Sequence, residues 1–97
     1  MKVSLTPEAE QELVEGALFY AREGSAALGE RFIVEFERCT ALLAEQPKLG
    51  AIWRGVIRRF PLRRFPYSVV YTLGTSEVRV LAVAHQSRKP GFWRGRA

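Results

Sequence analysis

The only histidine of the chain, His85, is followed closely by two cations, Arg88 and Lys89. Histidine titrates near neutral pH and can act as a general acid or base, and nearby cations can stabilise the charge that develops on a phosphoryl group during cleavage. The chain contains no Asp, so a Ser-His-Asp triad is excluded, and an orienting carboxylate would have to come from Glu77 or from the helices. The alternative interpretation is a structural histidine that only makes hydrogen bonds.

Two pairs of arginines, Arg58–Arg59 and Arg63–Arg64, flank a predicted turn. The planar guanidinium group suits phosphate or carboxylate, and aromatic residues between the cations could stack on bases or pack against a partner. Successive strand residues point to opposite faces, so at most one member of a pair can enter a given groove. The pattern fits equally well a solvated hairpin whose Phe60 and Phe65 lie in the core.

The end of the chain combines a turn with aromatic and basic residues. Pro90–Gly91 predicts the turn. Phe92 and Trp93 then either anchor the tail on the domain or face a partner, and we expect packing for at least one of them. Together with the arginine pairs, this segment predicts a surface that binds a target protein or a nucleic acid. Its members are Arg58, Arg59, Arg63, Arg64, Arg88, Lys89, Trp93 and Arg94.

The sequence predicts no metal site and no cofactor. One Cys and one His are too few for a structural zinc site, and neither GxxxxGK nor GxGxxG occurs. Cys39 lies on a predicted apolar helix stripe, which indicates a small buried side chain rather than a reactive thiol. A single cysteine also excludes an intrachain disulfide and fits a reducing compartment.

Charge is distributed unevenly along the 97 residues, whose net charge is +5. Residues 1–50 hold five Lys/Arg and nine Glu, a net of −4, whereas residues 51–97 hold ten Lys/Arg and one Glu, a net of +9. A basic half interleaved with aromatics predicts a face for a polyanion or an acidic partner rather than an ordinary solvated surface. No apolar run is long enough to span a membrane and no secretory signal pattern is present, so we expect a cytoplasmic, single-domain protein.

The elements that must position these residues follow from hydrophobic periodicity. We expect a strand over Met1–Leu5, a helix capped by Thr6–Pro7 that ends at a left-handed Gly24, and a second helix from Ser25 to about Gln46. A loop over Lys48–Arg54 then leads into three strands. These are Gly55–Leu62, Pro66–Leu73 and Glu77–Ala84.

This order predicts an α+β fold, β-α-α-β-β-β. The N-terminal strand joins a small, mainly antiparallel β-sheet, and an antiparallel helical hairpin packs its apolar stripes on one face. Glu35 and Arg38 are spaced to form an ion pair on the second helix. The apolar run Val80–Ala84 predicts a central strand covered on both faces for part of its length. The other face of the sheet is expected to be open and lined or rimmed by basic residues.

The sequence resembles RelE/ParE-type toxins over nearly its whole length. The opening Leu5-Thr6-Pro7-Glu8-Ala9 with Glu12-Leu13 and Phe19-Tyr20, the strand Phe65–Tyr71, and the segment Val80–His85 with Arg88-x-Pro90-Gly91-Phe92-Trp93 carry the resemblance. It implies a single toxin domain, residues 1–97, from a type II toxin–antitoxin module with roles in growth inhibition and plasmid stabilisation. It also implies a cognate antitoxin, acidic where it binds, that assembles with the toxin and blocks its basic surface.

The resemblance leaves two targets open. One branch of the family cleaves mRNA on the ribosome with Arg, Lys and a C-terminal Tyr, whereas the ParE branch poisons DNA gyrase without nuclease residues. The nuclease positions fall here on Ser68, at or near Gln86, and near Trp93. These departures favour a gyrase-directed, ParE-like toxin. The alternatives are a ribosome-dependent mRNA endonuclease, with His85, Arg88 and Lys89 as candidate catalytic residues, and a non-toxic nucleic-acid-binding module.

Overall fold

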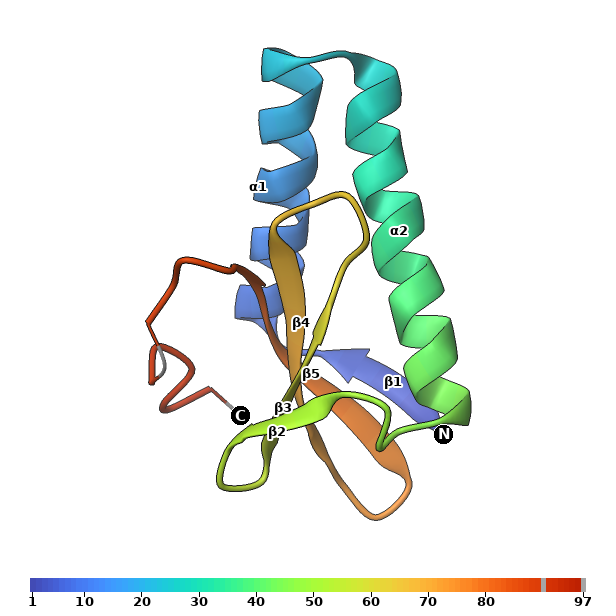
Figure 1. Ribbon diagram of the computed structural model, residues 1–97, viewed down its shortest axis with the longest axis vertical. Coiled ribbons are helices and arrows are strands. Elements are labelled where there is room, and N and C mark those ends of the chain that lie inside the picture. The colour runs from blue at the N-terminus through green and yellow to red at the C-terminus, as the bar shows by residue number, and fades with distance from the viewer. Residues whose placement is uncertain (90, 97) are drawn as a thin grey trace.

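A five-stranded sheet and a helical hairpin make up the protein in a computed structural model, which describes residues 1–89 and 91–96 (Figure 1). In chain order the elements are β1 (Lys2–Leu5), α1 (Pro7–Glu23), α2 (Ala26–Glu45), β2 (Ala51–Arg54), β3 (Ile57–Pro61), β4 (Tyr67–Leu73) and β5 (Glu77–His85). The strand order is β1-β5-β4-β3-β2, with β1 parallel to β5 and the remaining pairs antiparallel. The predicted α+β class and the helical hairpin on one sheet face are confirmed.

Both helices begin where the sequence predicts. The Thr6 hydroxyl accepts a hydrogen bond from Ala9 N with Pro7 in the first turn of α1, and the Ser25 hydroxyl accepts one from Leu28 N at the start of α2. These side chains satisfy backbone N–H groups that the first turn leaves without a partner. Gly24 ends α1 with φ −122°, so the expected left-handed conformation there is wrong.

The main core lies between the hairpin and the sheet. Buried residues of α2 supply its helical side, and alternate residues of β4 and β5 supply its sheet side. Tyr20 and Phe32 meet Phe65 and Tyr67 edge to face across this layer. The fully buried members of the predicted α2 stripe are Phe32, Cys39 and Leu43.

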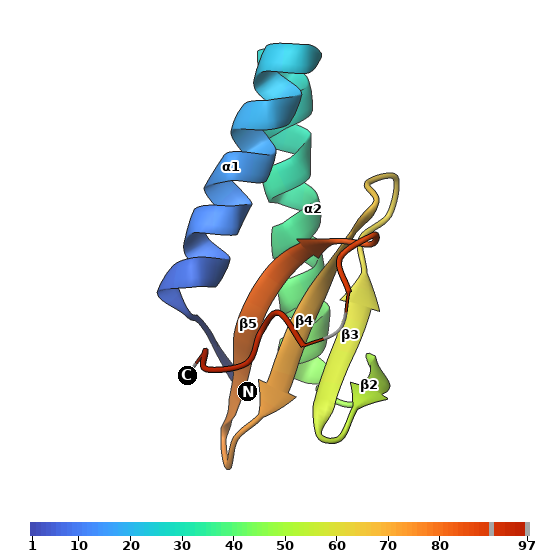
Figure 2. The ribbon, with the colours of Figure 1, turned by 90° about the vertical axis from the view of Figure 1, so that its left-hand side faces the viewer.

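The opposite face of the sheet is not open, contrary to expectation. The described residues after β5, 86–89 and 91–96, form a C-terminal tail that crosses back over β5 and β4 (Figure 2). Trp93 packs there on Val70, Leu81 and the alanines of β5. Apolar residues at consecutive positions of β5 therefore find cover on both faces, which confirms the prediction for this strand.

The segment predicted as a loop over Lys48–Arg54 contains an extra strand, β2. Its pairing with β3 makes a short hairpin whose turn includes Gly55 at φ +54°, and the predicted strand over Gly55–Leu62 begins only at Ile57. The hydroxyl of buried Tyr71 holds the segment that leads from α2 into β2, because it donates to Pro47 O (2.7 Å) and accepts from Gly50 N (2.9 Å). The short length of β2 and its exposed side chains explain why periodicity missed it.

Neither helix described by the structure is both long and apolar enough to cross a membrane. The predicted turn at Pro90–Gly91 falls partly outside the described residues, since Pro90 is not among them.

Candidate functional site

An ion pair fastens the tail to the first helix. Arg96 donates from Nη1 and Nη2 to the two carboxylate oxygens of Glu12, at 3.0 and 3.2 Å, and its Nη1 also donates to Leu81 O at 3.0 Å. Only 14% of the Arg96 side chain and 15% of that of Glu12 are exposed. Paired, charge-assisted hydrogen bonds at this depth hold the end of the tail in one position.

The same contacts cap the edge of β5 that β1 leaves uncovered. β1 pairs with β5 only as far as Val80. Beyond it, Val83 N donates to Glu12 Oε1 (3.1 Å), and Leu81 O accepts from the Thr6 hydroxyl (3.1 Å) as well as from Arg96. Leu81 is an extra residue in the ladder between β4 and β5, where Val70 faces Ala82 and Tyr71 faces Val80. The bulge thus presents the carbonyl group to which the tail binds.

Arg88 and Phe92 extend this anchor. The Arg88 guanidinium lies 4.2 Å from the centre of the Phe92 ring, and Nη1 lies 3.7 Å from Glu12 Oε2. The Arg96 guanidinium also approaches the Phe92 ring, at 5.3 Å. Phe92 therefore lies against two cations that a single glutamate neutralises in part. Lys89, next to Arg88, is exposed.

His85 ends β5 on the surface. Its Nδ1 lies 2.8 Å from the Ser87 hydroxyl and accepts a hydrogen bond from Ser87 N at 3.1 Å, while its ring meets Tyr67 edge to face. A pocket of about 220 Å³ brings His85 together with Tyr67 and Arg88, and with Glu12 and Glu15 of α1. These hydrogen bonds with Ser87 close a local turn. They match the alternative interpretation of His85 as a structural histidine.

Trp93 lies inside an aromatic cluster and not on the surface. It is 8% exposed, and its ring centre lies 4.7 Å from that of Trp53 and 5.2 Å from that of Phe92. The Arg59 guanidinium lies 4.7 Å from the centre of the Trp53 ring. Trp93 thus packs the tail on the sheet, and Arg59 adds an exposed cation on the Trp53 side of this cluster.

Ser68 and Gln86, at or near which the resemblance places the two arginines of the nuclease branch, line one pocket of about 390 Å³. The other lining residues are Arg59 and Pro61. In the described part of the chain, Arg59 is therefore the one charged side chain that lines this pocket. Ser68 is buried, and it offers a hydroxyl where a cation would be needed to bind a phosphate.

The remaining predicted surface residues are dispersed. Arg58 points to the helical side and donates to Gly50 O (2.8 Å) and Lys48 O (3.2 Å), so it braces the chain before β2. Arg63 and Arg64 lie in the turn between β3 and β4, against α2. Arg94 is exposed and lines a pocket of about 480 Å³ with residues of the β2–β3 turn. Of the predicted surface residues, Arg59, Arg88, Lys89 and Arg94 thus lie in or beside the tail, whereas Arg58, Arg63 and Arg64 lie on the helical side.

Three residues that organise the site were not predicted for this role. In the sequence, Glu12 stands out only as part of the family resemblance, Trp53 falls in the predicted loop, and Arg96 is one of the cations of the basic half. A helix glutamate gives no local signal of a partner 84 residues away.

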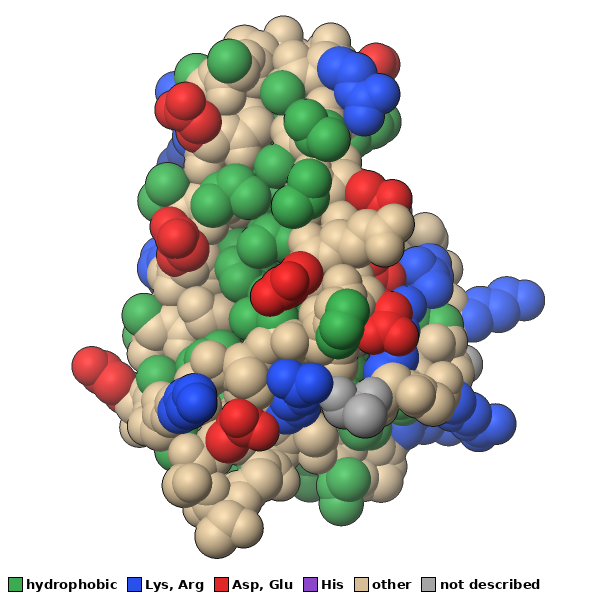
Figure 3. Space-filling view, turned by 180° about the vertical axis from the view of Figure 1, so that it is seen from behind, with side chains coloured by type: hydrophobic (Ala, Val, Ile, Leu, Met, Phe, Trp, Pro, Cys, Tyr) green, Lys and Arg blue, Asp and Glu red, His purple; other side chains and the backbone are tan. Residues whose placement is uncertain are grey.

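Seen from behind, Lys and Arg side chains project on the side of the molecule that carries the tail, while apolar side chains spread over the hairpin (Figure 3).

Comparison with known proteins agrees with this geometry. The family model described as the ParE toxin of the type II toxin–antitoxin system parDE matches residues 3–90. Among solved structures, one described as a chromosomal ParDE toxin–antitoxin system from P. aeruginosa superposes with a TM-score of 0.78 at 17% identity, over 88% of this chain and 95% of that one. No match was found among curated proteins. The chain belongs to the ParE toxin family of type II toxin–antitoxin systems.

Proposed function

We propose that this toxin inhibits growth by binding and poisoning DNA gyrase, and that a cognate antitoxin neutralises it by covering its basic surface. The observation that carries the proposal is the Ser68 and Gln86 pocket, where Arg59 is the only charged side chain among the described lining residues. Cleavage of a phosphodiester needs groups that move protons and stabilise phosphoryl charge. A toxin that acts by binding its target needs none of these groups, only a surface that is complementary to the target.

The proposed docking surface is the solvent side of the tail with the adjacent sheet. Arg88, Lys89 and Arg94 supply exposed charge, and Arg59 adds a cation beside them. Trp93 and Phe92 act from beneath by holding the tail in place. Arg58, Arg63 and Arg64 were included in the predicted binding surface because they are basic. They lie outside the tail region, so they are not part of the docking surface proposed here.

Supercoiling and cleavage assays with purified gyrase test this function. The toxin is expected to block supercoiling and to accumulate cleaved DNA, and the Arg88→Ala/Lys89→Ala/Arg94→Ala variant is expected to lose about tenfold or more in potency. Lys48→Ala, an exposed cation on the α2–β2 connection, is the matched control and should keep full potency. Gyrase that works unaffected in excess toxin contradicts the proposal.

A ribosome-dependent mRNA endonuclease is the second candidate, because His85, Tyr67 and Arg88 line one pocket with Glu12 and Glu15. Mapping of mRNA 5′ ends after induction would reveal new cuts within codons, and His85→Ala should abolish them. Growth arrest on induction, relieved by co-expression of a cognate antitoxin, would exclude a non-toxic nucleic-acid-binding module.

A further inference from the structure

A pocket between the β2–β3 turn and the C-terminal tail gathers two arginines. Its volume is about 480 Å³, within the range of small-molecule sites. Arg54 comes from the end of β2 and Arg94 from the tail, and both side chains are exposed. The fold therefore brings two cations from distant parts of the sequence to one space. The other lining residues are Gly55, Ile57, Gly91 and Trp93.

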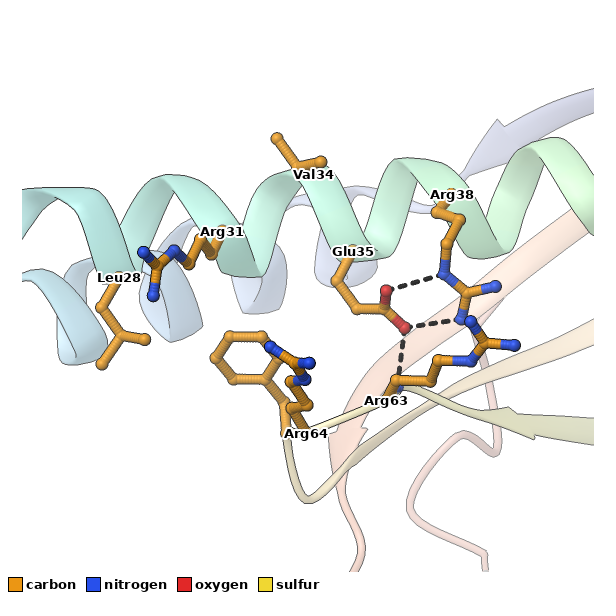
Figure 4. A pocket seen from close by; sticks show the side chains of 8 residues that line it. Leu28, Arg31, Val34, Glu35, Arg38, Arg63 and Arg64 are labelled. Atoms are coloured by element: carbon orange, nitrogen blue, oxygen red, sulfur yellow. Dashed lines mark hydrogen bonds and ion pairs between the residues drawn. The ribbon is translucent and has the colours of Figure 1, made fainter.

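Neither arginine of this pocket is neutralised by the part of the chain that the structure describes. Within residues 1–89 and 91–96, no carboxylate lines the pocket, and neither guanidinium has an ion pair or a side-chain hydrogen bond. The arginine pocket between α2 and the β3–β4 turn differs, because Glu35 lies in it (Figure 4). That carboxylate accepts hydrogen bonds from Arg38 Nε and Nη2, both at 2.7 Å, and from the backbone N of Arg63 at 2.6 Å. Two like charges that share a space without a counter-ion favour an anion between them.

Two glycines leave the pocket open to a ligand. Gly55 has φ +54° and Gly91 has φ +104°, backbone conformations that a side chain would strain. A Cβ at Gly55 would meet no atom within 4 Å, so the backbone of the turn is open to approach. A Cβ at Gly91 would lie 3.7 Å from Arg94 Nε, which shows that the Arg94 guanidinium lies close to the Gly91 backbone. A ligand can therefore reach both guanidinium groups without meeting a bulky wall.

The lining residues suit phosphate groups better than a base or an apolar side chain. Trp93 is 8% exposed and packs on Trp53, so it offers no open ring on which a base could stack. Ile57 is half-buried. Guanidinium forks are always charged and bind phosphate oxygens in pairs. Two forks that face one space of this size suit an anion with several phosphates in line.

We propose that this pocket binds the polyphosphate group of a small molecule, such as a nucleoside triphosphate. Arg54 and Arg94 bind the phosphate oxygens, and the nucleoside extends towards solvent because the described lining offers it no open ring. The bound polyphosphate ties the tail to the β2–β3 turn, at a point separate from the Glu12–Arg96 ion pair. The inference goes beyond the proposed function, since it requires neither gyrase nor an antitoxin.

Isothermal titration calorimetry with the whole chain tests this binding. The probes are inorganic triphosphate, ATP, GTP and AMP, all in EDTA so that no Mg²⁺ competes for the phosphates. We expect triphosphate, ATP and GTP to bind with Kd values below about 1 mM and within about fivefold of one another, because the phosphates carry the recognition. AMP should bind at least about tenfold more weakly, since one phosphate does not bridge both arginines.

Substitutions locate the site. Arg54→Ala should weaken triphosphate binding by about tenfold or more, whereas Lys48→Ala, with the same change in net charge, should change Kd less than about twofold. Both positions are exposed, and thermal unfolding checks that each variant folds. Should Arg54→Ala fail to fold, Arg94→Ala gives the same comparison from the tail side. Arg54→Lys keeps the charge without the planar fork and should recover only part of the affinity.

Thermal unfolding with ligand gives a second readout. Triphosphate at about ten times its Kd should raise the Tm of the unchanged protein by about 5 °C, because it binds only the folded chain. The same concentration should raise the Tm of Arg54→Ala by less than about 1 °C.

Four results would overturn the proposal. The first is no binding of triphosphate at millimolar concentration. The second is AMP that binds as tightly as ATP, which would mean that a single phosphate suffices. The third is equal weakening by Arg54→Ala and Lys48→Ala, which would mean generic attraction to a basic protein. The fourth is a short DNA duplex that, at equal phosphate concentration, binds more tightly than triphosphate and loses affinity with Arg54→Ala. These assays contain no gyrase, so failure of this proposal is distinguishable from failure of the gyrase proposal.

Discussion

Removal of the Glu12 carboxylate should release the tail and destabilise the protein. Glu12→Ala deletes the acceptor of bonds from Arg96 and Val83 N, and it leaves Arg96, 14% exposed, without a counter-ion. Removing one partner of a buried pair costs about 3–5 kcal/mol. Arg96 sits close to the end of the chain and can move outward to water, so we take the lower end, about 3 kcal/mol. The contact of Arg88, at 3.7 Å and half exposed, adds little.

Urea unfolding and Trp fluorescence measure this effect together. A loss of about 3 kcal/mol corresponds to a fall in Tm of more than about 10 °C for a domain of this size. Trp93 is packed on Trp53, so release of the tail should also shift the emission of the folded state to longer wavelength. Glu15→Ala, one turn along α1 and exposed, is the matched control and should cost less than about 0.5 kcal/mol.

A double-mutant cycle of Glu12→Ala with Arg96→Ala should give a coupling energy above about 1.5 kcal/mol. The reasoning is refuted if Glu12→Ala matches Glu15→Ala in stability with unchanged emission, because the tail would then be held by the Trp93 cluster alone.

Three further predictions concern the rest of the fold. The pKa of Glu35 is lowered to about 2 from 4.5, chiefly by its hydrogen bonds from Arg38. Its stabilising contribution is therefore complete above pH 4.5 and is lost as pH falls towards 2, so Glu35→Gln should flatten the free energy of unfolding over that window in acid titrations. Burial raises the pKa of the Cys39 thiol to about 12, so iodoacetamide at pH 8 should label it only after denaturation, and labelling of the native protein would contradict its buried position. Gly29→Ala would place a Cβ 2.7 Å from Ala17 O, and we expect a loss of about 2 kcal/mol despite a gain in helix propensity, whereas Gly74→Ala, with ordinary contacts, should be nearly neutral in thermal unfolding.

The sequence by itself determined both helices, four of the five strands and the helical side of the core. Thr6, Pro7 and Ser25 act within one turn of their own positions, and the stripe of α2 repeats with the period of the helix, so local chemistry was sufficient. The Glu35–Arg38 pair was predictable for the same reason. The family resemblance was equally a property of the sequence, and the family match confirms it.

Only the tertiary structure decided how the tail lies and which cations are available. The pairing of Glu12 with Arg96 spans 84 residues, and β2 forms because β3 offers it an edge; neither has a periodic signal. Arg58, Arg59, Arg63 and Arg64 look alike in the sequence, yet one braces a loop, one covers Trp53 and two line a pocket on α2. The reason is physical: residue type fixes what a side chain can bind, whereas chain topology fixes what it meets.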